Sequence, residues 1–152
     1  MKLTAHFALA EFTRSESAKR HGVSNEPTPE HLENLKVLCE KVLEPIRMKF
    51  GPINISSGYR SKTLNHYIGG SLKSEHMEGR AADIDMDGMG GPTNKQIFDY
   101  IKDNLDFNQL IFEFGTATNP DWVHVSFHEG KNKKQVLRAL KVNGKTAYAP
   151  YK

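Results

Sequence analysis

The chain has 152 residues, of which 38% are hydrophobic and 26% are charged, and its formal net charge is +3. This length suits one domain with a single hydrophobic core, and the composition excludes an intrinsically disordered protein. The mean hydropathy is -0.59 and no apolar run approaches the ~20 residues of a spanning helix, which excludes a membrane-spanning protein. The single cysteine, Cys39, excludes an internal disulfide and a zinc site built from several cysteines.

The first residues of the chain lack the apolar stretch of a secretory signal. His6 and Glu11 interrupt the apolar residues around them, and only one lysine precedes them. We therefore expect synthesis in the cytoplasm, which agrees with a lone cysteine kept in a reducing compartment.

The charges are distributed unevenly along the chain. Residues 130–152 contain seven Lys or Arg residues and no acidic residue. This basic tail is either a hairpin with solvated lysines on its outer face or a surface that contacts an anionic partner. Base rates for charge runs favour the solvated hairpin.

The N-terminal part of the chain predicts helices. Residues 8–21 form the first, and Gly22 closes it. Residues 29–46 form a longer core helix, because apolar residues recur there at intervals of three and four. Pro45 is expected to kink this helix. Residues 61–68 predict a third, short helix.

The remaining segments predict strands and one further helix that begins after Thr93. The dipeptide Asn143-Gly144 is a strong hairpin signal between the last two strands. Helices that come first and strands that come later favour an α+β fold, with a mostly antiparallel sheet packed against the N-terminal helices. The expected strands cover residues 53–57, 82–86, 110–114, 122–127, 136–142 and 145–148.

Two segments carry residue types that bind zinc. His76 and Asp83 lie within residues 74–83, where a glycine and two alanines let a loop turn tightly into a strand. His124 lies on a predicted strand and faces away from its two valine neighbours. Two imidazoles, one carboxylate and a water molecule form the ligand set of a catalytic zinc site. Spacing alone leaves open that each histidine is an ordinary surface or core residue.

Three motifs occur in a fixed order along the chain: Ser56-Ser57-Gly58-Tyr59-Arg60-Ser61, Ser74-x-His76-x-x-Gly79-x-Ala81-x-Asp83 and Asp121-Trp122-Val123-His124. Together they resemble the zinc D-alanyl-D-alanine peptidases that share the hedgehog-type fold. Residues 12–15 and 43–47 resemble the phage or bacterial branch of that family. The resemblance therefore extends to about Phe127.

The resemblance implies a role for each matching residue. His76, Asp83 and His124 are implied to be the ligands of one zinc ion per chain. Asp121, three residues before the last ligand, is implied to be the general base that takes a proton from the attacking water. Arg60 is implied to bind the terminal carboxylate of the peptide or the developing oxyanion.

Three other polar residues near these motifs admit more than one interpretation. Ser74 either holds the substrate or caps the turn before His76. Glu113 is expected at an exposed strand end, with the orientation of a ligand histidine as the alternative role. His128 stands four residues after His124, about 13 Å away on a strand, which is too far to share one metal ion.

A calcium site is a weaker alternative. Residues 83–88 match the first half of an EF-hand loop, with carboxylates at its first, third and fifth positions. The twelfth position is Asn94 instead of the bidentate glutamate, and Pro92 interrupts the loop. The sequence therefore does not favour calcium.

These expectations combine into one function. Residues 1–152 are expected to form a zinc-dependent peptidase that hydrolyses amide bonds in the stem peptides or crosslinks of bacterial peptidoglycan. It would act as a D-alanyl-D-alanine carboxypeptidase or endopeptidase, with a phage endolysin released by lysis as one form. The expected partner is a peptidoglycan peptide, with no nucleic acid and no membrane, and the chain is expected to be a monomer. An inactive wall-binding or structural module on the same fold, with the basic tail as its contact surface, is the alternative.

Overall fold

A six-stranded sheet forms the centre of the protein. The computed structural model describes residues 1–152, and its strand order is β1-β2-β4-β3-β5-β6. Neighbouring strands are antiparallel except for β3 and β5, which run parallel. The predicted α+β fold with a mostly antiparallel sheet is confirmed. The strands are β1 (Ile55–Ser57), β2 (Ala81–Ile84), β3 (Gln109–Glu113), β4 (Trp122–Ser126), β5 (Gln135–Val142) and β6 (Lys145–Pro150).

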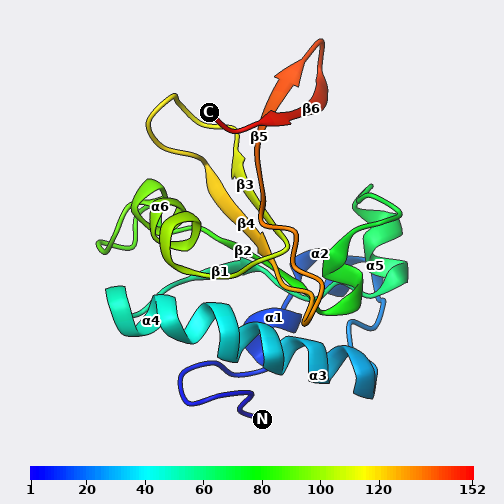
Figure 1. The fold of residues 1–152 in the computed structure, drawn as a ribbon. Coiled ribbons are helices and arrows are strands. Elements are labelled where there is room, and N and C mark those ends of the chain that lie inside the picture. The colour runs from blue at the N-terminus through cyan, green and yellow to red at the C-terminus, as the bar shows by residue number, and fades with distance from the viewer.

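The helices lie around this sheet. Figure 1 shows α3 and α4 end to end along one side of the sheet, with the β5–β6 hairpin extending away from them. No helix is both long enough and apolar enough to cross a membrane. The helical elements are α1 (Ala10–Thr13), α2 (Glu16–His21), α3 (Pro29–Leu38), the π-helical turn η1 (Cys39–Leu43), α4 (Glu44–Phe50), α5 (Lys62–Tyr67), the 3-10 turn η2 (Glu75–Glu78) and α6 (Asn94–Asn104).

The first predicted helix is divided into α1 and α2. Arg14 has an extended backbone, which ends α1. The side chain of Ser15 then accepts a hydrogen bond from the backbone N–H of Ala18 and caps the start of α2. Gly22 closes α2 in the left-handed conformation, as its position predicts.

The predicted core helix continues through Pro45 by widening its turn. Proline has no N–H, and its ring collides with the carbonyl group four residues earlier in a regular α-helix. Here α3 passes into the π-helical turn η1, where the N–H of Glu44 donates to the carbonyl oxygen of Cys39. The helix therefore resumes as α4, with the proline in its first turn.

One face of the sheet carries the hydrophobic core. On β4, the fully buried Val123 and Val125 alternate with Trp122 and His124, which belong to the other face. That second face is therefore free to carry polar groups. The core joins residues of the sheet to the apolar sides of α3, η1, α4 and α6, including Leu35, Leu38, Val42, Ile46, Ile84, Ile97, Phe98, Ile101, Leu110, Phe112, Val123 and Val125.

The basic tail forms the β5–β6 hairpin. Asn143 and Gly144 both have positive φ angles, of 52 and 76 degrees, as a two-residue hairpin turn requires. The six lysines of residues 130–152 are all exposed, as expected for a solvated hairpin, and some of the basic groups also lie over aromatic rings. The Arg138 guanidinium lies 4.1 Å from the centroid of the Phe112 ring, and the Lys141 ammonium lies 5.3 Å from that of Phe114.

Gly79 directs the chain from η2 into β2. Its φ angle is 73 degrees, and a Cβ atom at this position would collide with the backbone carbonyl oxygen of His31 on α3. Only glycine meets both conditions without strain. Because η2 carries His76 and β2 carries Asp83, this turn also sets the distance between those two side chains.

We expect Gly79→Ala to destabilise the fold by more than about 2 kcal/mol, because it adds a backbone collision to the strain of a positive φ angle. Gly88→Ala is the matched control, since Gly88 has a φ angle of 75 degrees and nothing within 4 Å of its would-be Cβ atom. It should cost only about 1 kcal/mol. Urea denaturation measures both values, and equal losses would contradict the collision.

Candidate metal centre

Three ligand-type side chains converge on the polar face of the sheet. His76 comes from η2, Asp83 from β2 and His124 from β4. Asp83 Oδ1 lies 3.4 Å from His76 Nε2 and 3.1 Å from His124 Nδ1. All three side chains are capable of offering a ligand atom within 4.8 Å of the other two. The structure thus brings together the three residues predicted as metal ligands.

Strand pairing and local hydrogen bonds position these groups. In the antiparallel register of β2 and β4, Asp83 is directly opposite His124. His76 Nδ1 donates to the carbonyl oxygen of Gly58 at 2.6 Å, which leaves Nε2 facing Asp83. A histidine ligand held in this way by its second nitrogen is typical of metal sites.

Ser74 caps the turn that carries His76. Its hydroxyl accepts a hydrogen bond from the backbone N–H of His76 at 3.2 Å. Ser74 also lines the cavity described below. The capping role is therefore observed, while contact with a substrate stays a prediction.

The environment favours the cation-binding forms of His76 and Asp83, whereas His124 retains its proton more readily. Burial lowers the pKa of His76, so its imidazole is neutral at ordinary pH. Burial alone would raise the pKa of Asp83, but the adjacent His76 and His124 lower it and keep the carboxylate ionised. Burial also acts to lower the pKa of His124, but its hydrogen bond with Asp83 raises it. A divalent cation that bound His124 would release the proton that the raised pKa favours on its imidazole.

These residues lie in a cavity of about 600 Å³. Arg60 forms part of its lining, and its Nε atom is buried without a hydrogen-bond partner. The indole Nε1 of Trp122, another lining residue, is likewise buried, and it acts on Glu113, whose pKa it helps to lower. The unpaired donor of Arg60 is therefore available to bind a polar group of a ligand.

The sequence from Ala5 to Ser126 matches the model of a known family, described as Peptidase M15. The chain belongs to the peptidase M15 family. The match contains all three converging side chains and Arg60, and it ends before β5. The predicted resemblance to zinc D-alanyl-D-alanine peptidases is thereby confirmed at the level of the family. No curated protein matches the chain closely enough to add to this assignment.

The predicted general base of this M15 peptidase is not beside the ligand group. Asp121 is exposed, precedes β4, and does not line the cavity. An odd spacing of three residues from His124 places the two side chains on opposite faces of a regular strand. The backbone oxygen of Asp121 instead accepts a hydrogen bond from Asn94 at 3.0 Å. The sequence-based role of Asp121 thus lacks the proximity that it requires.

Glu113, unlike Asp121, lines the cavity together with the ligand candidates. It is only 7% exposed and lines the cavity, in contrast to the exposed strand end expected for it. Burial raises its pKa to about 7, although His124 acts to lower it. The alternation of Gln109, Ile111 and Glu113 with two apolar residues was the signal that placed Glu113 on the polar face.

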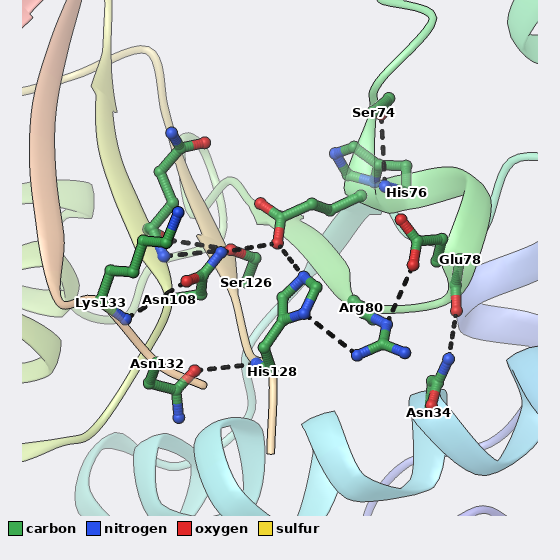
Figure 2. A network of polar contacts seen from close by, with 12 residues as sticks. Asn34, Ser74, His76, Glu78, Arg80, Asn108, Ser126, His128, Asn132 and Lys133 are labelled. Carbon is green, nitrogen blue, oxygen red and sulfur yellow. Dashed lines mark hydrogen bonds and ion pairs between the residues drawn. The ribbon is translucent and has the colours of Figure 1, made fainter. Parts of the chain in front are cut away.

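A polar network joins η2 to the segment that follows β4, as Figure 2 shows. His128 Nε2 donates to Glu75 at 2.8 Å, and Arg80 Nη1 donates to His128 Nδ1 at 3.1 Å. Asn108 also donates to Glu75, at 3.0 Å. His128 is therefore no metal ligand in this arrangement, as predicted from its spacing, and instead ties η2 to the end of β4.

The EF-hand pattern does not form a calcium loop. Asn94 Nδ2 donates to Asp85 Oδ1 at 3.2 Å and to the backbone oxygen of Pro120 at 3.2 Å. An amide donor thus occupies the place where a cation would meet Asp85. The one group of His, Cys, Asp or Glu side chains with suitable ligand spacing is the one around Asp83.

We expect His76→Ala to abolish tight metal binding, because two protein ligands rarely hold zinc. His66→Ala is the control, since His66 is exposed on α5. Metal analysis of the purified proteins, after zinc loading and gel filtration, measures the bound ion. A His76→Ala protein that retained one zinc ion per chain would contradict the assignment of this centre.

In the metal-free protein, Glu113→Gln should stabilise the fold near pH 8 by on the order of 2 kcal/mol, with the gain fading toward pH 4. The pKa of Glu113 rises from 4.5 to about 7 on folding, so the wild-type protein loses stability as the pH increases through this window. Urea denaturation with a chelator present measures the difference. Glu129→Gln, at an exposed position, is the control, and the same pH-dependent gain there would refute the burial argument.

Proposed function

We propose that this M15 peptidase is a zinc enzyme that hydrolyses amide bonds in bacterial peptidoglycan peptides. The observation that carries the proposal is the convergence of His76, Asp83 and His124 beside Glu113 in one cavity. Membership of the peptidase M15 family supports the reaction class. We infer that the chain works as a monomer, without nucleic acid or membrane, on wall material that it reaches after release, including release by phage lysis.

The donor set fits a zinc ion. Two imidazole nitrogens and one carboxylate oxygen are ligands that zinc accepts, and three protein ligands leave a position for the reaction. When bound there, zinc would supply a Lewis acid that acidifies water and polarises a carbonyl group. The hydrogen bond from His76 to Gly58 holds one ligand in the orientation that this binding requires.

Glu113 is the carboxylate best placed to move protons in the cavity. Burial raises its pKa to about 7 in the metal-free protein, and a buried carboxylate at this place is suited to accept a proton from the attacking water and return that proton to the leaving amine. No covalent bond between enzyme and substrate is needed, because water is the nucleophile. Glu113 therefore takes the general-base role in this proposal.

Arg60 is the fixed positive charge of the cavity. Its Nη1 atom lies 3.4 Å from Asn65 Oδ1, while its buried Nε has no partner. A guanidinium group held in this way suits a carboxylate or a developing oxyanion. Binding of a terminal carboxylate would make the enzyme a carboxypeptidase, and binding of an internal carbonyl would make it an endopeptidase.

We expect the zinc-loaded wild-type protein to release peptide fragments from purified peptidoglycan, and a chelator to stop the release. Glu113→Gln should lower turnover by about 10²- to 10⁴-fold while zinc stays bound. Asp121→Asn is the matched control and should retain nearly full turnover, because Asp121 lies outside the cavity. Mass spectrometry of the fragments measures turnover and distinguishes a released terminal D-alanine from a cut crosslink. A large loss in Asp121→Asn with little loss in Glu113→Gln would overturn the assignment of the base.

A further inference from the structure

We propose that the β5–β6 hairpin is a substrate-binding wall, in which Tyr148 holds the peptide on the side of the cleaved bond away from Arg60. This inference rests on the proposed peptidase function. The hairpin lies beyond Ser126, where the match to the family ends. It nevertheless supplies Leu137, Thr146 and Tyr148 to the lining of the cavity.

The register of the sheet explains how hairpin residues reach the cavity. On β3, Ile111 and Glu113 face the cavity. The parallel neighbour β5 pairs Leu137 with Ile111 and Ala139 with Glu113. Side chains paired across neighbouring strands lie on the same face of a sheet. The cavity face therefore continues from β3 onto β5.

The same face continues onto β6 and ends at Tyr148. The antiparallel register pairs Tyr148 with Ala139, so Tyr148 lies in one row with Glu113. The small, fully buried side chain of Ala139 leaves room above it for the tyrosine ring. Tyr148 is 57% exposed and thus accessible to a ligand at the cavity mouth. Burial of its ring and the charge of Glu113 raise its pKa, which keeps the phenol protonated as a donor.

The strand order places the hairpin and Arg60 at opposite ends of the cavity. Arg60 follows β1 at one edge of the sheet, whereas β6 forms the other edge. The metal-ligand candidates on β2 and β4 lie between them. A peptide that crosses the strands with its anionic end at Arg60 would therefore pass the ligand group and continue toward the hairpin.

Strand spacing sets the length of peptide that can reach Tyr148. From β4 to β6 there are three steps in the sheet, which correspond to about 14 Å at ~4.8 Å per step. An extended peptide covers about 3.3 Å per residue, and the Tyr148 side chain lines the same cavity as Asp83 and Glu113, whose charges act on it. Tyr148 should therefore contact the substrate roughly two to four residues from the cleaved bond. The hairpin thus favours stem peptides over dipeptides.

The test compares two synthetic stem peptides that differ in length on the side away from Arg60, with about one or about four residues beyond the cleaved bond. For Tyr148→Phe, we expect KM for the long peptide to rise about 3- to 10-fold more than KM for the short one, the loss expected for one hydrogen bond. Tyr67→Phe is the matched control, since Tyr67 is 51% exposed on α5 and does not line the cavity. Zinc content and the urea midpoint verify that both proteins are intact.

A second measurement separates binding from turnover. Calorimetry in the Glu113→Gln background compares the Kd of the long peptide with and without Tyr148→Phe, and the same 3- to 10-fold weakening is expected. Equal effects on both peptides, or no effect on the long one, would overturn the role of Tyr148 while leaving the peptidase function intact. A wild-type protein that neither binds nor hydrolyses any wall peptide would instead refute the proposed function.

Discussion

The antiparallel pairing of β2 with β4 is the constraint on which the site depends. It places Asp83 directly opposite His124, so that a carboxylate and an imidazole meet although 41 residues separate them along the chain. A shift of one residue would turn one of these side chains into the core. The buried valines of β4 prevent that shift, because they would have to face the polar side of the sheet. Core packing thus specifies the geometry of the candidate metal centre.

The carboxylate of Asp83 is buried, so it would destabilise the fold if no partner of opposite charge lay beside it. An isolated charge in such a position is strongly unfavourable, and here two histidines lie beside it. A divalent cation would neutralise the same group more completely, so binding of the ion and stability of the fold are linked. The network through Glu75 and His128 adds a second support, since it holds η2 against the end of β4.

The two faces of the sheet divide structure from chemistry. The helical elements α3, η1, α4 and α6 cover one face with apolar contacts, and the other face carries the ligand candidates, Glu113 and the residues of the hairpin. The strands β2, β4, β3, β5 and β6 each contribute to one cavity. Through this hairpin, the basic C-terminal segment reaches the site. Its Arg138 and Lys141 lie against the aromatic rings of Phe112 and Phe114.

The sequence by itself determined the α+β class, the ligand candidates and the Asn143-Gly144 turn, because periodicity, motif order and turn chemistry are local properties of the chain. It also predicted Arg60 in the site. Only the tertiary structure showed that Glu113 lines the cavity and Asp121 does not, because this depends on which face of paired strands each carboxylate occupies and on how deeply it is buried. The contribution of Tyr148 was likewise invisible before folding, since it arises from pairing across three strands, and no local pattern records which strands become neighbours.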